Sequence, residues 1–358
     1  MTSLDSKVFG TRLRNARKMA GLSLQQLSDS LSREVTKQAL SKYEKGLMKP
    51  NSNLLFKIAK ALFVKPDYFL QPGILDLGEI SFRKKVSLPK GVEDAIVERA
   101  RDYVERYLEL EDLIGRSHQF ENPLVDTLID TKADVKKAAH NLRQVWKLGN
   151  GPISSIVEVL ELRGIKVQLI RDSDDFDGFA AYSMNQIPVV VVNTADRFVE
   201  RVRFTIIHEL AHIILNLSDS IKADNKLTEQ YCHYFSSCFL LPEEAIYERL
   251  GAGKRSYIVI RELIHLKEQF GISIRAIVHR LRTIGVISDT YYRRWMIYMS
   301  KTYGSKKEPG AFNGQELSVV FNMMIDRALS EGIISFSKAA SLANTTIEAI
   351  RTNYQGVK

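Results

Sequence analysis

Residues 206–214 read IIHELAHII, and the pattern HELAH at His208–His212 decides the fold of this region. Apolar residues recur on both flanks at helical spacing, which predicts a buried helix. Because positions i and i+4 share a helix face, His208 and His212 can bind the same metal ion, with Glu209 beside them as a general base. A helix carrying two histidines by chance is the alternative, but buried histidines need polar partners. The stretch therefore predicts a zinc site for peptide-bond hydrolysis.

The third zinc ligand is expected in the segment EQYCHYF, residues 229–235, which also has a helical pattern. Cys232 and His233 follow Glu229 at i+3 and i+4, so all three share one face and compete for the metal. We favour Glu229 over His233, because a carboxylate leaves the zinc Lewis-acidic. Cys232 is interpreted as a small buried residue, with an oxidation-sensing thiol as the alternative. Three side chains remain equal candidates for stabilising an oxyanion: Tyr231, Tyr234 and His233.

Two motifs resemble a known family. Arg203-Phe204-Thr205 before HELAH is similar to the R-F-T-x-x-H-E-L-x-H signature of the ImmA/IrrE metallopeptidases, and residues 229–242 are similar to that family's E-x-x-A-x-x-F-A-x-x-L-L-M-P segment. The family's zinc-ligand glutamate falls on Glu229, while Cys232 and His233 stand where alanine and asparagine are common. The resemblance implies a zincin-like domain of a family that cleaves helix-turn-helix repressors and relieves repression.

Strands are predicted before this helix. Residues 165–170 alternate apolar and polar side chains, and residues 178–183 and 187–192 flank a hairpin turn at residues 184–186. The run of four valines at 189–192 predicts a central strand, and such a sheet can lend an edge to a substrate peptide or serve only as core structure. Residues 174–178, DDFDG, are similar to the same family's D-F-D-G-F region. We interpret this acidic stretch as a solvated turn rather than a calcium site.

Most of the net positive charge lies at the N-terminus. The chain has 358 residues and a net charge of +9, and residues 1–72 alone hold 13 Lys and Arg against 5 Asp and Glu. Basic charge concentrated beside a compact apolar pattern is typical of a nucleic-acid binder. An evenly charged, soluble surface would not concentrate it in this way.

Short helices are predicted in this basic region. Phe9, Leu13, Ala16 and Ala20 share a face that ends at Gly21; Ser23 and Gln26 form a capping box, and Thr36 can cap a helix over residues 37–45. Leu40 and Tyr43 are the inward pair of that last helix. The residues expected to contact DNA bases or phosphates are Gln25, Gln26, Lys37, Gln38, Ser41 and Lys42. Residues 13–70 resemble the XRE-type helix-turn-helix of Cro and phage repressors, with a helical protein-interaction domain as the alternative.

A long helix is expected from Pro89 to Gly115, after the domain boundary at Pro72-Gly73. Its apolar seam can pair with a two-fold mate or pack against its own chain; the seam comprises Ile96, Ala100, Tyr103, Tyr107, Leu110 and Ile114. Helix-turn-helix proteins usually read operators as dimers, which favours a homodimer. We therefore divide the chain into a helix-turn-helix domain (1–72), a linker with a long helix (73–122), a metallopeptidase domain (123–250) and a helical C-terminal subdomain (251–358).

The C-terminal region is expected to be helical over residues 263–287 and 331–350. Arg275, His279, Arg280 and Arg282 can contact DNA there, although packing or substrate docking is equally consistent with their placement. Cys232 and Cys238 are six residues apart and are not expected to form a disulfide. Absence of an apolar run of membrane-spanning length or a secretory signal favours the cytoplasm.

These patterns together predict an α+β, predominantly helical protein. The expected function is that of a DNA-binding transcriptional regulator with a zinc-dependent endopeptidase domain, in which His208, His212 and Glu229 hold Zn²⁺ and Glu209 is catalytic. The expected partners are a double-stranded DNA operator and a protein substrate, either a helix-turn-helix repressor or another copy of the chain. The alternative is a regulator, or an antitoxin-like module, whose zincin fold senses a ligand or partner without proteolysis.

Overall fold

The computed structural model describes residues 3–71, 81–84, 88–116, 119–172, 176–183, 186–304 and 307–353. The boundary expected at Pro72-Gly73 lies outside these residues, as do Asp174, Asp175, Met184 and Asn185 of the predicted turns. Within them the chain is α+β and predominantly helical, as predicted, with a four-stranded and a two-stranded sheet. None of the helices in this described part is long and apolar enough to cross a membrane.

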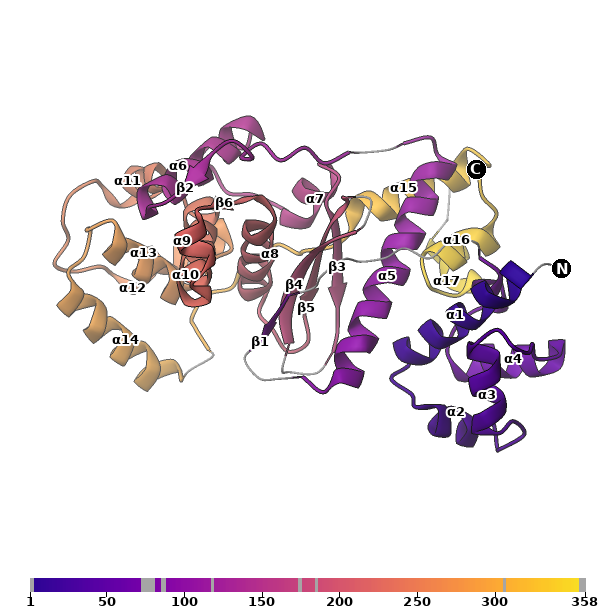
Figure 1. The fold of residues 1–358 in the computed structure, drawn as a ribbon. Coiled ribbons are helices and arrows are strands. Elements are labelled where there is room, and N and C mark those ends of the chain that lie inside the picture. Colours follow the sequence, from indigo (N-terminus) through magenta and orange to yellow (C-terminus); the bar gives the residue numbers. More distant parts are fainter. Residues whose placement is uncertain are drawn as a thin grey trace.

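The N-terminal region is a bundle of short helices around its own apolar core (Figure 1). The elements are α1 (Ser3–Met19), α2 (Leu24–Ser30), α3 (Lys37–Glu44), α4 (Ser52–Ala61) and the 3₁₀ helix η1 (Pro66–Leu70). The predicted caps are present: Ser23 and Gln26 form the capping box of α2, and the Thr36 side chain accepts from the backbone of Ala39. Gly21 follows α1 with a positive φ of 68°. Local sequence therefore determines where these helices begin and end.

The larger sheet has the strand order β1-β4-β5-β3. Its strands are β1 (Ser81–Lys84), β3 (Lys166–Ile170), β4 (Phe176–Tyr182) and β5 (Pro188–Asn193). β3 runs parallel to β5, whereas β1 and β4 are antiparallel neighbours, as are β4 and β5. β5 is internal, as the valine run predicts, and β1 and β3 form the two edges.

Helices cover both faces of this sheet, because alternate residues of β5 point to opposite sides. Val190 and Val192 belong to a first core, and Val189 and Val191 belong to a second. The first core contains α8 (Val199–Ile214), which lies across one face of the sheet (Figure 1). The second contains α5 (Lys90–Leu113), α15 (Val319–Ser330) and α16 (Phe336–Leu342) on the other face.

The remaining elements extend the first core or lie at its border. They are β2 (Leu128–Ile129), α6 (Lys132–Val145), α7 (Ile156–Glu161), β6 (Asn216–Leu217), α9 (Asp219–Lys222), α10 (Asn225–Leu240), α11 (Glu243–Leu250), α12 (Ile260–Phe270), α13 (Ile274–Thr283) and α14 (Asp289–Tyr303). The last helix, α17 (Ile347–Asn353), instead packs beside α16, with Ile350 against the second core. The parallel pair β2 and β6 forms the second sheet.

The apolar seam of α5 packs against its own chain. Ile96, Ala100, Tyr107 and Leu110 are almost completely buried against the sheet and α15, and Tyr107 stacks on Phe321 with ring centroids 5.0 Å apart. Of the two interpretations of the seam, the structure therefore favours packing within the chain. A dimer would have to use another surface.

The C-terminal basic residues also serve packing in the structure. Arg280 is 1% exposed, donates to the Leu241 carbonyl at 2.9 Å and contacts the Cys238 sulfur at 3.0 Å. Arg275 pairs with Glu308 at 3.2 Å. Both cysteines are free and buried, as expected.

Candidate metal centre

Two helices bring the predicted metal ligands together. His208 and His212 lie one turn apart on α8, and Glu229 lies in the first half of α10. Glu229 Oε2 is 3.3 Å from His208 Nε2, and its Oε1 is 3.2 Å from His212 Nε2. The two histidine Nε2 atoms are themselves 3.1 Å apart. His208 is fully buried, whereas the side chains of His212 and Glu229 are 28% and 38% exposed, so the cluster opens to solvent on one side.

These separations suit a tetrahedral metal ion. Bonds of about 2.05 Å at the tetrahedral angle place two ligand atoms roughly 3.3 Å apart. The three measured separations, 3.1, 3.2 and 3.3 Å, fall at this value. Two neutral nitrogen donors and one carboxylate are also a donor set that zinc accepts, with a fourth position left for water.

The electrostatics of the cluster favour positive charge between the donors. Burial disfavours the charged form of His212, but hydrogen bonds with Cys232 and Glu229 outweigh it and raise the His212 pKa to about 10. Burial likewise opposes ionisation of Glu229, but hydrogen bonds from His208 and His212 hold its pKa well below its usual value. The carboxylate is thus kept ionised where a cation would bind.

The two uncertain neighbours of Glu229 occupy different places. His233 is exposed, and its donor atom lies within 4.8 Å of donor atoms of His208 and Glu229. Its ring is 4.5 Å from that of His208 and stacks on Phe204. Cys232 is fully buried, with its sulfur 3.6 Å from His212 Nδ1, the ring nitrogen on the far side from Glu229. Cys232 therefore packs against the side of His212 that faces away from Glu229, as expected of a small buried residue.

Glu209 is 1% exposed and lies where β4 crosses α8. Gly178 of β4 makes this close crossing possible: a Cβ atom there would lie 2.9 Å from the Val191 carbonyl, 3.0 Å from Thr205 and 3.3 Å from the Glu209 side chain. β4 thus passes directly over the residue that follows the first histidine.

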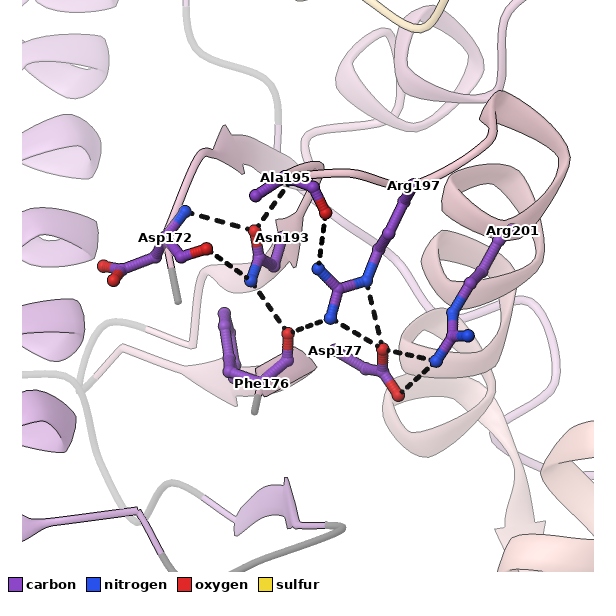
Figure 2. A network of polar contacts seen from close by, with 7 residues as sticks. All are labelled: Asp172, Phe176, Asp177, Asn193, Ala195, Arg197 and Arg201. Carbon is purple, nitrogen blue, oxygen red and sulfur yellow. Dashed lines mark hydrogen bonds and ion pairs between the residues drawn. The ribbon is translucent and has the colours of Figure 1, made fainter. Parts of the chain in front are cut away.

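A polar network holds β4 in this position (Figure 2). Asp177 accepts from Arg197 at 3.0 Å and from Arg201 of α8 at 2.8 Å, while Arg197 also donates to the Phe176 carbonyl. Asn193 at the end of β5 donates to the same carbonyl at 3.0 Å. The prediction of a solvated turn at residues 174–178 is therefore wrong for 176–178, which begin β4 with Phe176 buried. A period-2 pattern did not mark this start, because Phe176 and Phe179 are three residues apart.

The three side chains considered for stabilising an oxyanion differ in which groups their polar atoms contact. The Tyr231 hydroxyl donates to the Asp130 carbonyl at 3.1 Å, and Tyr234 lies beside Arg280, whose guanidinium is 5.8 Å from the ring centre. His233 alone of these three lies among the expected metal ligands.

The residues expected to contact DNA lie on α2 and α3. Lys37, Gln38 and Lys42 are exposed, and Ser41 is half-buried. On α2, Gln25 and Gln26 are exposed but already hold local bonds: Gln25 donates to Asp29 at 3.2 Å, and the Gln26 carbonyl oxygen accepts from the Ser23 backbone at 2.8 Å. The side-chain nitrogen Nε2 of Gln26 takes no part in the capping box, whose second bond runs from the Gln26 backbone N–H to Ser23 Oγ. Leu40 and Tyr43 face the core, as predicted.

Family comparisons match both the helix-turn-helix region and the region that contains the candidate metal ligands. Residues 13–69 match the helix-turn-helix family, and residues 161–282 match the IrrE N-terminal-like domain, which is of metallopeptidase type. A comparison with curated proteins gave no match. The first range contains α2 and α3, and the second contains strands β3, β4 and β5 of the larger sheet together with α8 and α10. The chain is therefore a fusion of an XRE-type helix-turn-helix region with an IrrE N-terminal-like, metallopeptidase-type region.

Proposed function

We propose that this DNA-binding regulator is a zinc-dependent endopeptidase that cleaves a helix-turn-helix repressor, in trans or in another copy of itself, and so relieves repression. The observation that carries the proposal is the convergence of His208, His212 and Glu229 at mutual distances of 3.1 to 3.3 Å. These three residues would hold the zinc ion, which when bound supplies Lewis acidity toward a scissile carbonyl and toward water.

The remaining chemistry belongs to the chain itself. Glu209 follows the first ligand on α8 and is buried under β4, which limits its freedom of movement. It would accept a proton from the attacking water and return it to the leaving amine. His233 would donate to the developing oxyanion, because it is the candidate that lies beside His208 and is also exposed.

The helix-turn-helix region would bring this activity to an operator. Lys37, Gln38, Ser41 and Lys42 present donors along the start and exposed face of α3, with Gln25 and Gln26 near the phosphate backbone. We further propose that the protein acts in the cytoplasm as a homodimer on a two-fold operator. Sedimentation of the full chain on operator-length duplexes tests the dimer: one chain bound per duplex contradicts it.

The decisive experiment on proteolysis replaces Glu209 by glutamine, which retains shape but cannot accept the proton. Glu209→Gln protein should bind one zinc per chain and bind DNA as the parent does, but should neither cleave the repressor in vitro nor relieve repression in cells. Glu248→Gln, an exposed change, is the matched control and should behave as the parent does. Unchanged derepression by Glu209→Gln would contradict proteolysis and support the sensing alternative.

DNA recognition is tested separately. Lys37→Ala combined with Gln38→Ala should abolish sequence-specific binding, because both side chains lie at the exposed start of α3. Lys60→Ala removes one charge from exposed α4 and should change binding only slightly. Retained specificity in the double variant would contradict the assignment of α3 as the recognition helix.

A further inference from the structure

A cleft of about 450 Å³ lies where the helix-turn-helix region meets the rest of the protein. One wall comes from the end of α1 and the segment from Leu62 to Gln71, and the opposite wall comes from α5, β3 and the chain around α16. Figure 1 shows α1 and α16 beside α5 at this junction. The volume is that of a pocket for a small molecule, and none of the lining residues is a candidate metal ligand.

Two polar atoms of the cleft are buried without a partner. Among the described residues, neither Lys65 Nζ nor Gln168 Oε1 has a hydrogen-bond partner. The amide nitrogen of Gln168 is engaged, because it donates to the Arg99 carbonyl at 3.3 Å. A buried donor and a buried acceptor left unpaired cost stability, so their presence together in one cleft indicates a ligand that supplies the missing partners.

The other charges of the cleft are already paired. Arg99 binds Asp172 at 2.5 Å and the Met19 carbonyl at 3.0 Å, and Arg106 binds Asp102 at 2.9 Å. Lys65 is thus the one lining charge, among the residues described, that lacks a hydrogen-bonded partner. With Arg99 and Arg106 each paired to a carboxylate, the unpaired Lys65 ammonium is the group that favours an anion in this cleft.

The rest of the lining sets the character of the ligand. Met19, Leu62 and Val64 provide apolar surface beside the polar groups. A molecule that satisfies the cleft therefore needs an anionic acceptor, a separate hydrogen-bond donor and an apolar body between or beside them.

We propose that this cleft is the binding site of a small organic acid, whose carboxylate pairs with the Lys65 ammonium and whose hydroxyl or N–H group donates to Gln168 Oε1. Lys65 belongs to the helix-turn-helix region and Gln168 to β3, so the bound acid bridges the two. The existing link includes ion pairs between α1 and α5, Arg12 with Glu105 and Lys18 with Asp94, besides the hydrogen bond from Arg99 to the Met19 carbonyl. The acid would add a further connection, and its effect on repression rests on the proposed function, whereas its binding does not.

The test uses the full chain and two probes that carry the required groups, N-acetyl-leucine and 2-hydroxy-4-methylpentanoate. Their uncharged amides serve as matched ligands. Each acid should raise the unfolding midpoint and give saturable heat on titration, while each amide should bind at least about tenfold more weakly, as expected for loss of a charge-assisted bond. Absence of binding by both acids, or equal binding of acids and amides, overturns the proposal.

Variants locate the site. Lys65→Met keeps the unbranched chain as far as Cε, removes the unpaired ammonium, and should weaken binding of the acid by about tenfold or more. Gln168→Leu should weaken the hydroxy acid and the N-acetyl acid alike, and it provides a second variant if Lys65→Met does not fold. Lys60→Met, on exposed α4, is the control for loss of one positive charge. Parent-like affinity in folded Lys65→Met or Gln168→Leu protein overturns the assignment, and neither result depends on peptidase activity.

Discussion

The buried carboxyl group of Glu161 should make the stability of the protein fall as the pH rises. Glu161 ends α7 and is 1% exposed. Its Oε1 accepts from Ser318 at 2.5 Å and from the Tyr103 hydroxyl at 3.4 Å, and a backbone hydrogen bond from Val320 also favours the charged form. Lys166, whose charge favours the ionised form of Glu161, is engaged with Glu111 at 2.7 Å. Burial therefore outweighs these contacts and raises the Glu161 pKa from 4.5 to about 7.

The sign and size of the effect follow from proton linkage. Between pH 4.5 and about 7 the folded protein keeps a proton on Glu161 that the unfolded chain has lost. Stability is then lost as the pH rises through this interval and is constant above it. The interval corresponds to roughly 3 kcal/mol of unfolding free energy.

Glu161→Gln isolates this contribution, because glutamine resembles the protonated acid and does not ionise. At about pH 5 the variant and parent should be similar in stability, whereas at about pH 8 the variant should be more stable by roughly 3 kcal/mol. Urea denaturation followed by the fluorescence of Trp146 and Trp295, both in the first core, measures the difference. Glu158→Gln on the same helix controls for loss of a carboxylate. An equal stability difference at both pH values would refute the reasoning.

Three further changes probe the packing. Arg203→Met should destabilise the fold by about 3–5 kcal/mol, because it leaves buried Glu316 without its ion pair; adding Glu316→Gln should recover part of the loss in urea denaturation. Gly178→Ala should displace Glu209 and lower repressor cleavage more than zinc content, since its Cβ would lie 3.3 Å from the Glu209 side chain; equal losses of both would contradict this. Gly10→Ala should destabilise the helix-turn-helix region by about 1–3 kcal/mol and weaken DNA binding, because the new Cβ would lie 2.6 Å from the Glu44 carbonyl; metal binding should be unaffected.

Sequence alone predicted the features that depend on local spacing. The caps at Ser23 and Thr36 use donors only three residues away, so the chain specifies them without its tertiary fold. The shared face of His208 and His212 is likewise a consequence of helical geometry. The valine run of β5 predicted a central strand because both of its faces are buried.

Features that depend on distant segments could not be predicted in this way. The seam of α5 has the spacing of a dimer interface, and only the position of Phe321 in α15, more than two hundred residues later, shows that it is filled by the same chain. Helical spacing placed Cys232 and His233 on the Glu229 face but could not show which histidine each of them contacts. The crossing of α8 and α10 does so, because it puts Cys232 against His212 and His233 against His208.

The support of the candidate metal centre also crosses the predicted domain boundary at residue 250. Glu316 pairs with Arg203 of α8 and accepts from the backbone amides of Ile156 at 2.8 Å and Val157 at 2.9 Å. One carboxylate therefore caps the N-terminus of α7 and also neutralises the charge of Arg203 on the helix that carries His208 and His212. Gly271 after α12 lies so close that an added Cβ would be 2.5 Å from Arg203 Nε. A division by packing therefore groups α12, α13 and the segment around Glu316 with the metallopeptidase-type region. Both helices contribute to the first core, and Glu316 supplies the ion-pair partner of buried Arg203.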